Sequence, residues 1–461
     1  MRRRLSSSVF VLFFVTATAT QSLAKSEKKK PEDIEEVSQP EHPADEPPDA
    51  TDSPSPPSVP KAPSLPTPTP DKAAEQSPGL GLPPPPRPLK LESEDGNTIK
   101  FGILMQPSYE AATRRLNDIK GWGQDLYLHR LRFIVGGTVF HDFDYFISTD
   151  YPDLFKQVNT VDSTGTPTYL KNFPGMNLSD AFLTYKAADA FKIDAGYMLP
   201  PMAHNAVQGA ATLYGLDYFA NTFLHKDAFA TTANPRVFNP NANPLGRDLG
   251  VQFRGLLFRG LLEYRAGLFQ GRREPPGGVS IDMPTSPGGR NMFRVAGRLQ
   301  LNLLDPETGF FYAGTYLGAK RVLSVGASVD FQASYLYWAY DGLLDLPLGP
   351  GVVTAQVNLA QWDGGTWIVS PYLVKERALM AEAGYLIAPI RVSPIVRYEQ
   401  RWVASTETTP ALTEKRYSGG LAFWPRGHNV NLKLFYSRSY PNFPDTHMYQ
   451  ELNLQWQLYF F

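Results

Sequence analysis

The sequence contains no cysteine. This absence excludes disulfide bonds, thiolate-bound metals and a cysteine nucleophile from the chemistry of the chain. A dominant charge is also missing, because 44 Lys+Arg residues stand against 45 Asp+Glu residues and leave a formal net charge of −1. A balanced charge gives no general attraction to nucleic acid, so we expect no nucleic-acid partner.

Catalytic and metal-binding signatures are missing as well. The seven His residues are scattered without a metal-binding spacing such as HxxxH, and no GxSxG nucleophile motif occurs. The Gly-rich stretches Pro275–Ser280 and Ser286–Arg290 lack the Lys-Ser/Thr pair of a phosphate-binding loop and are typical of turns. We therefore expect no enzymatic activity, no metal and no cofactor.

The one long apolar run lies at the start of the chain, in residues 1–24. Three arginines, Arg2 to Arg4, precede an apolar core around Val9 to Val15, and small residues follow up to Ala24. This order is typical of a secretory signal peptide cleaved before Lys25. The apolar core is much shorter than the roughly 20 residues that a membrane-spanning helix needs, so we expect a mature chain outside the cytoplasm.

Residues 25–96 are rich in Pro, Ser, Lys, Asp and Glu, including Pro54–Pro70 and Pro83–Pro86. Such a composition cannot bury much apolar surface, which predicts a disordered, extended Pro-rich arm in the periplasm. The arm is either an inert linker or a spacer that contacts the cell wall. Of the charged residues, 11 of the 44 Lys+Arg and 15 of the 45 Asp+Glu precede residue 97, so residues 97–461 are slightly basic.

From residue 97 onward the texture of the sequence changes to alternation with a period of two. Segments of about ten residues place apolar and polar side chains in turn, and clusters of Gly, Pro, Asn and Asp separate them. Clear examples are Arg130–Val139, Arg247–Arg254 and Arg294–Asn302. We count about fourteen to sixteen such segments, and the last of them, Glu451–Phe461, ends the sequence.

Two architectures contain alternating strands: a soluble sandwich, with the apolar face inside, and a membrane barrel, with the apolar face toward lipid. The number of segments, the secretion signal, and Tyr or Trp near segment ends favour the barrel. The predicted fold is all-β: a transmembrane antiparallel β-barrel of about 16 strands over residues 97–461, preceded by the disordered Pro-rich segment. The strand Ile99–Tyr109 should pair with the last strand, with Phe460 outward and Phe461 as an overhang of lumen parity.

Three stretches resemble the phosphate-selective porins, the porin O and P family. They are Tyr127–Tyr151, Leu178–Met202 and Gly246–Gly271, and the final pair of strands from about Asn429 is similar as well. The resemblance spans the chain beyond residue 97, but it consists of a similar residue pattern and short motifs.

The resemblance implies a 16-stranded barrel, usually a homotrimer, in the outer membrane of a Gram-negative-type bacterium. It also implies a long loop folded into the lumen, for which Pro200–Leu245 is the candidate, and anion binding by Arg and Lys on the lumen wall. This chain departs from the family pattern at His129, at Leu104 and at the turn Leu199–Met202. These departures favour a general channel over a strictly phosphate-selective one.

The basic side chains that share the polar parity of their strands are the candidate anion-contacting, pore-lining residues. A guanidinium group suits phosphate and carboxylate because its forked N–H donors reach two oxygens at once. The candidates are Arg130, Arg132, Lys186, Lys192, Arg254, Arg265, Arg294 and Arg298. For each of them the alternative is a structural ion pair with a neighbouring carboxylate, which Glu263 beside Arg265 and Glu399 beside Arg397 illustrate.

The sequence therefore predicts an outer-membrane porin for passive diffusion of small hydrophilic solutes. We expect a mild preference for anions, with phosphate as a candidate, and membrane lipid and small anionic solutes as partners. The alternative is a structural barrel that is tethered to the cell wall through its Pro-rich arm.

Overall fold

The computed structural model describes residues 88–113, 121–161, 167–219, 246–271, 293–332, 335–363, 375–405, 410–442 and 447–461. For residues 158–161 and 167–170 it describes the backbone alone. The predicted signal peptide and residues 25–87 of the predicted arm lie outside the described residues. The remaining part of that arm contains a strand, β1 (Leu89–Glu92), which pairs with the first residues of the next strand.

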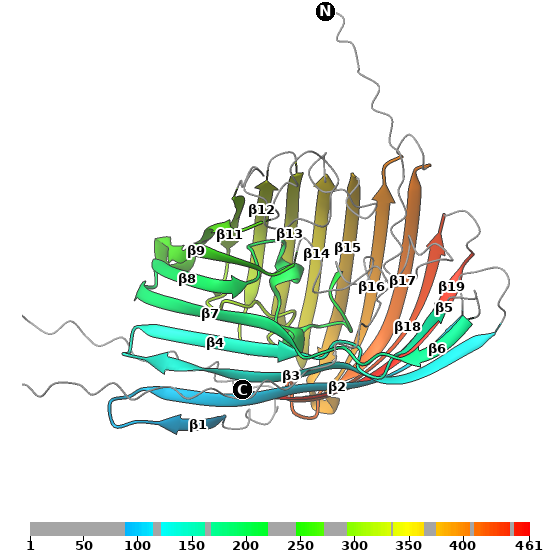
Figure 1. Ribbon diagram of the computed structural model, residues 1–461, viewed down its shortest axis with the longest axis horizontal. Coiled ribbons are helices and arrows are strands. Elements are labelled where there is room, and N and C mark those ends of the chain that lie inside the picture. The colour runs from blue at the N-terminus through cyan, green and yellow to red at the C-terminus, as the bar shows by residue number, and fades with distance from the viewer. Residues whose placement is uncertain are drawn as a thin grey trace, which may run out of the picture. The chain divides into compact units, whose positions relative to one another are not determined.

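Sixteen antiparallel strands form the wall (Figure 1). They are β2 (Thr98–Thr113), β3 (Trp122–Val139), β4 (Phe143–Asp150), β7 (Asn177–Ala188), β8 (Phe191–Met198), β9 (Asp248–Leu257), β10 (Leu262–Phe269), β11 (Arg294–Asn302), β12 (Val322–Gln332), β13 (Tyr335–Leu348), β14 (Gly351–Asp363), β15 (Glu376–Ile387), β16 (Val392–Val403), β17 (Leu412–Phe423), β18 (Val430–Pro441) and β19 (Tyr449–Phe460). The hairpin β5 (Gln157–Val161) and β6 (Pro167–Lys171) forms a separate two-stranded sheet. Short 3₁₀ turns, η2 (His204–Val207), η3 (Ala210–Thr212), η5 (Phe258–Gly260) and η6 (Ala388–Ile390), complete the elements.

The sheet is closed. Each strand pairs with its neighbours along the chain, and β19 pairs with β2 through Glu451↔Ala112 to Phe460↔Ile103. Closure gives every strand a partner on both sides and leaves no open edge in the wall. The predicted barrel of about 16 strands is therefore confirmed, and so is the pairing of the last strand with the first.

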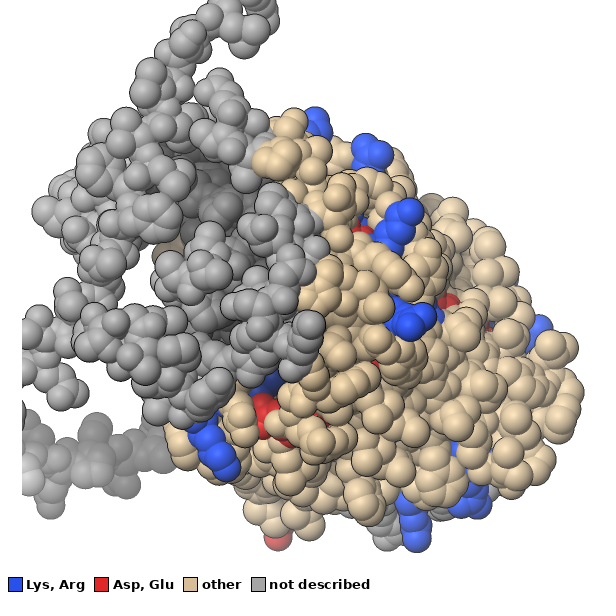
Figure 2. All heavy atoms as spheres, turned by 90° about the vertical axis from the view of Figure 1, so that its right-hand side faces the viewer, with Lys and Arg blue, Asp and Glu red and all other residues tan. Residues whose placement is uncertain are grey.

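The predicted alternation is confirmed along the strands. On β11, Arg294, Arg298, Gln300 and Asn302 are buried, while Leu299 and Leu301 are exposed. The same pattern repeats around the wall, because successive side chains of a strand point to opposite faces. The outer face is thus largely apolar and exposed, and the inner face carries most of the charged and amide side chains. Figure 2 shows one outer face that is mainly uncharged, with separate Lys and Arg side chains.

The two ends of the barrel differ in their connections. At the end where β3 meets β4, six of the seven connections are two to six residues long, and the exception joins β11 to β12 through residues 303–321. At the other end the connections run from 7 to 49 residues, apart from the two residues between β12 and β13. Among the described residues, no helix is long and apolar enough to cross a membrane.

The last residue has a defined place inside the barrel mouth. Phe461 has the predicted lumen parity, but it is not a free overhang, since its ring packs edge-on against Phe146 with centroids 5.6 Å apart. Two glycines of the inner wall make room for it: a Cβ on Gly102 would lie 2.8 Å from the Phe461 Cβ, and one on Gly136 would lie 2.8 Å from its ring. Phe461 therefore belongs to the inner packing.

Candidate functional site: the barrel lumen

The inner wall is densely charged. Among the described residues, the buried charged side chains comprise eight Arg and one Lys against six Asp and seven Glu. Burying so many ions is tolerable only when they are paired and hydrogen-bonded. The balance of buried charge slightly favours carboxylates, although residues 97–461 as a whole are slightly basic.

All eight predicted basic residues face the lumen, and each lies within 4 Å of a carboxylate. The pairs are Arg130–Asp217, Arg132–Asp150 (2.8 Å), Lys186–Asp144 (2.7 Å), Lys192–Asp189 (3.5 Å), Arg254–Asp194 (2.8 Å), Arg265–Glu263 (2.8 Å), Arg294–Asp330 (2.6 Å) and Arg298–Asp341 (2.6 Å). A solute anion at any of these positions has to compete with a carboxylate that is already bound. The structural ion pair is thus present at every candidate.

Several of the carboxylate partners of these residues lie on neighbouring strands, which the parity of a single strand could not show. Arg254 on β9 pairs with Asp194 on β8, and Arg294 on β11 pairs with Asp330 on β12. Since side chains directly across or diagonal on neighbouring strands lie close together, an arginine without an acidic neighbour on its own strand still has one beside it. The two pairs that the sequence did suggest, Arg265–Glu263 and Arg397–Glu399, form at 2.8 and 2.6 Å.

A first inserted segment, residues 199–219, follows β8 into the lumen. Its backbone is held by the inner wall on widely separated strands: Lys433 of β18 donates to the carbonyl oxygens of Leu213 and Gly215, both at 2.7 Å. Four strands away along the wall, the Asn205 N–H donates to the Asn358 side chain of β14 at 3.1 Å. The described part of the predicted lumen loop therefore lies inside the barrel; residues 220–245 of that loop lie outside the described residues.

A second inserted segment, residues 303–321, enters from the opposite end and was not predicted. Arg265 of β10 donates to the carbonyl oxygens of Phe310 (2.7 Å) and Gly309 (3.1 Å). His428, in the turn after β17, contacts the Thr315 carbonyl at 2.9 Å, and burial lowers the pKa of His428 to about 4. A sequence signal existed, because Asp305–Lys320 breaks the alternation with Pro, Gly and a Phe-Phe-Tyr run.

The two segments meet inside the barrel. Backbone bonds join them, with the Gly209 N–H donating to the Tyr312 carbonyl at 2.9 Å. The His204 ring stacks on Tyr312 with centroids 4.6 Å apart, and its Nε2 lies 2.9 Å from Glu307.

Glu307 is the buried acid of this junction. Burial alone would raise its pKa, but the charge of His204 and hydrogen bonds from His204, Tyr316 and Gln300 hold it below its ordinary value. The junction is therefore a buried carboxylate hydrogen-bonded to His204, Tyr316 and Gln300, and it links one inserted segment to the other.

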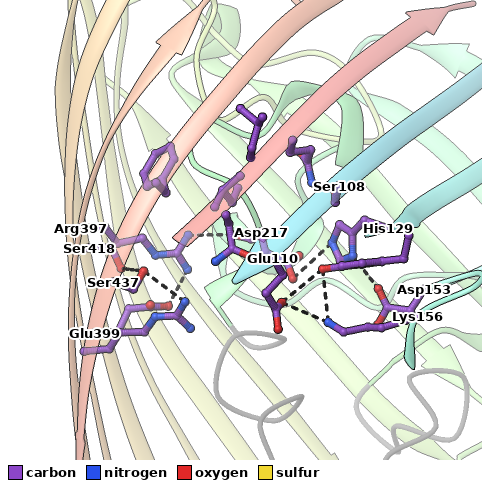
Figure 3. Close-up of a pocket in the computed structure, with 17 residues that line it drawn as sticks. Ser108, Glu110, His129, Asp153, Lys156, Asp217, Arg397, Glu399, Ser418 and Ser437 are labelled. Carbon is purple, nitrogen blue, oxygen red and sulfur yellow. Dashed lines mark hydrogen bonds and ion pairs between the residues drawn. The ribbon is translucent and has the colours of Figure 1, made fainter. Parts of the chain in front are cut away.

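A cavity of about 130 Å³ remains beside the first segment. Figure 3 shows Arg397, Glu399, Ser418 and Ser437 on one side of it. A second cluster lies on the other side, namely Glu110, His129, Asp153 and Lys156, and Asp217 of the inserted segment lies between the two groups. Within the second cluster Lys156 bonds Glu110 at 3.2 Å and His129 bonds Asp153 at 2.8 Å. The lining combines these paired polar side chains with the apolar side chains of Leu216, Phe435 and Leu454.

No metal-binding geometry is present in the part of the chain that the structure describes. There, no group of three or more His, Asp or Glu side chains is placed to hold a metal ion.

Comparison with known proteins gives structural matches only. No protein-family model and no curated protein matches the sequence. Among solved structures, the chain is similar to the outer membrane channel DcaP of Acinetobacter baumannii, with 12% identity, a TM-score of 0.45, and coverage of 80% of this chain and 99% of that one. It is also similar to Salmonella typhi OmpF in complex with daunomycin (10%, 0.45, 80% and 100%) and to a BenF-like porin from Pseudomonas fluorescens Pf-5 (11%, 0.43, 78% and 99%). At these identities and TM-scores the similarity assigns no role to a residue.

Proposed function

We propose that this protein is an outer-membrane porin through which small hydrophilic solutes diffuse passively. One observation carries the proposal: a closed 16-stranded barrel has an exposed apolar outer face and a charged inner face. A lipid bilayer requires every backbone N–H and C=O group to be paired within the protein, which a closed barrel achieves. Such barrels place short turns in the periplasm and longer loops outside, so the end with the long connections is the extracellular one.

We propose further that the channel prefers anions only mildly, with phosphate as a candidate. The wall offers guanidinium groups, which suit oxyanions. Their carboxylate partners cancel most of the field that would otherwise concentrate anions. The pairs Arg294–Asp330 and Arg298–Asp341, both at 2.6 Å, support this weak selectivity.

Passage is restricted by the inserted segments. Residues 199–219 and 303–321 contact each other and the inner wall, so solutes must pass beside them. We therefore propose a low conductance compared with an empty barrel of 16 strands. The paired polar side chains that line part of the cavity near Asp217 support such a path.

Conductance of the purified full chain in planar bilayers tests the proposal. We expect discrete channels, and in a KCl gradient a reversal potential shifted slightly toward the chloride potential. The double variant Arg130→Ala/Arg294→Ala should reduce that shift, whereas Lys90→Ala on the exposed strand β1 should not. A barrel that folds without conducting contradicts the porin proposal, and a cation-selective channel contradicts the anion preference.

The tether to the cell wall and the homotrimer are proposals from the sequence alone. Deleting residues 25–87 distinguishes the porin hypothesis from the tether hypothesis. The porin hypothesis expects the shortened protein to conduct ions. The tether hypothesis is favoured if neither the full chain nor the shortened protein conducts and the shortened protein no longer attaches to the cell envelope. Light scattering of the purified protein in detergent tests the trimer.

A further inference from the structure

The outer surface carries a polar strip on six adjacent strands. The strip consists of Gln361 (β14), Arg377 (β15), Gln400 (β16), Lys415 (β17), Arg438 (β18) and Gln450 (β19). Each of these residues has the outward parity of its strand, since both sequence neighbours of Arg377, Lys415 and Arg438 are buried. The strip interrupts a face that is otherwise apolar.

Strand register makes the strip continuous. Gln361 lies opposite Arg377, Gln400 lies opposite Lys415, and Arg438 lies opposite Gln450. The remaining steps are diagonal by two residues, because Arg377 lies opposite Trp402 and Lys415 lies opposite Tyr440. Since neighbouring strands are about 4.8 Å apart and successive residues about 3.4 Å, the three strand spacings and the two diagonal steps put Arg377 and Arg438 about 20 Å apart, with Lys415 between them.

The strip lies at one height on the barrel. Its members are eight to ten residues from the short-turn end of their strands, as from Lys415 to Phe423 and from Arg377 to Ile387. At about 3.4 Å per residue and a strand tilt of about 40°, this distance is about 21–26 Å along the barrel axis. The apolar band of a membrane barrel is about 25 Å tall, so the strip marks its extracellular edge.

The three cations of the strip are unusual in this wall. Among the described residues of the 16 barrel strands, Arg377, Lys415 and Arg438 are the Lys and Arg side chains that face outward, and all three are exposed. Within the described residues none of them lies within 4 Å of a carboxylate, whereas every inward candidate does. Arg377 bonds Gln361 at 3.0 Å, and the nearby outward acid, Asp363, is paired with Lys375 at 3.9 Å.

Aromatic side chains of interface type accompany the cations. Tyr417 is 51% exposed beside Lys415, and Tyr440 is 43% exposed beside Arg438. Tyr and Trp are enriched where lipid tails meet headgroups. The surroundings of the strip therefore place its charges at the headgroup level, where long basic side chains can reach polar groups.

We propose that this strip is a binding site for phosphorylated lipid headgroups of the outer leaflet. The inference rests on the proposed placement of the barrel in the membrane. Lys and Arg bind phosphate through charge-assisted hydrogen bonds, and the glutamine amides at both ends supply further donors. A phosphate group would provide the negative partner that the described residues of the wall do not provide for Arg377, Lys415 and Arg438.

Lipid binding by the purified full chain in an uncharged detergent tests the site. The probes are lipid A with its phosphates and the same lipid after dephosphorylation, and the readout is the bound fraction by native mass spectrometry. We expect preference for the phosphorylated form, and a loss of about fivefold in affinity for each cation removed at low salt. The test variant is Arg377→Gln/Lys415→Gln/Arg438→Gln.

A matched control removes the same charge at the opposite end. Lys90, Arg259 and Arg321 are exposed there, and their triple replacement by Gln should leave the lipid preference unchanged. Heat-modifiable gel mobility verifies that each variant is folded. Three outcomes would each overturn the site. The first is equal binding by wild type and the strip variant, and the second is equal binding of the two lipids. The third is a change of oligomeric state in the strip variant without an effect on lipid binding.

The same preparations separate this inference from the proposed function. A wild-type channel that conducts ions but does not distinguish the two lipids rejects the lipid site alone. A barrel that binds phosphorylated lipid but does not conduct ions rejects the porin proposal alone.

Discussion

Removing one carboxylate from the wall should convert a neutral pair into an anion site. Asp341 of β13 accepts two hydrogen bonds from Arg298, at 2.6 and 2.7 Å, and one from the His204 N–H at 3.1 Å. Both side chains of the ion pair are almost fully buried. Asp341→Asn keeps the shape of the side chain and removes its charge, which leaves Arg298 with a net positive charge at the lumen.

The magnitude of the effect follows from the distance at which an anion approaches. A unit charge 4 Å away contributes about 1 kcal/mol in water and about 4 kcal/mol at the effective dielectric of a protein surface. We therefore expect the ratio of anion to cation permeability to rise by at least about fivefold. Breaking a buried pair also costs about 3–5 kcal/mol of stability, so the anchorage of His204 should weaken and the conductance should increase.

The assay is the reversal potential of single channels in a KCl gradient at two ionic strengths. The shift of the reversal potential should be smaller in about 1 M salt than in about 0.1 M salt, because the screening length falls from about 10 to 3 Å. Asp144→Asn is the control, because its pair with Lys186 is 42% and 32% exposed and such pairs contribute about 1 kcal/mol or less. An unchanged selectivity in a conducting Asp341→Asn channel would show that passing ions do not sense the charge of Arg298, which would contradict the expected anion site.

Two further predictions concern the last residue and the junction of the inserted segments. Gly102→Ala should destabilise the barrel by about 1–3 kcal/mol, because its Cβ would clash with the Phe460 carbonyl and lie 2.8 Å from the Phe461 Cβ. Gly419→Ala, with nothing within 4 Å, should not; urea unfolding in detergent measures both, and equal effects would refute the packing role of Phe461. The lowered pKa of Glu307 means that its pair with His204 stabilises the fold above pH 4.5 and is lost as pH falls through the lowered value. Conductance should therefore change at acidic pH in wild type and less so in Glu307→Gln, and identical pH profiles would contradict this role.

The strand pattern could be predicted because it depends on local chemistry. The alternation of Arg294, Arg298 and Gln300 with Leu299 and Leu301 is visible in the sequence. The barrel requires such alternation on every strand of its wall. The parity of all eight basic candidates follows in the same way.

The pairing of those candidates could not be predicted in the same way. Arg298 on β11 bonds Asp341 on β13, and Arg130 on β3 bonds Asp217 on the first inserted segment. Such partners are 43 and 87 residues away along the chain, and nothing in a single strand indicates them. The segment 303–321 escaped prediction for a related reason, because its stability comes from contacts with the inner wall and the other segment.

The first inserted segment also constrains how the barrel can assemble. It is bound on both sides of the contact between β19 and β2: Gln457 of β19 donates to the Ala211 carbonyl at 2.8 Å, and Arg130 of β3 pairs with Asp217. Because these contacts lie on both sides of the closing pair of strands, we expect the segment to be in place before the last strand pairs with the first. We expect that, in pulse-labelling hydrogen exchange during folding, the Gly209 amide becomes protected no later than the amides that join β19 to β2. The reverse order would show that the segment threads into a finished barrel.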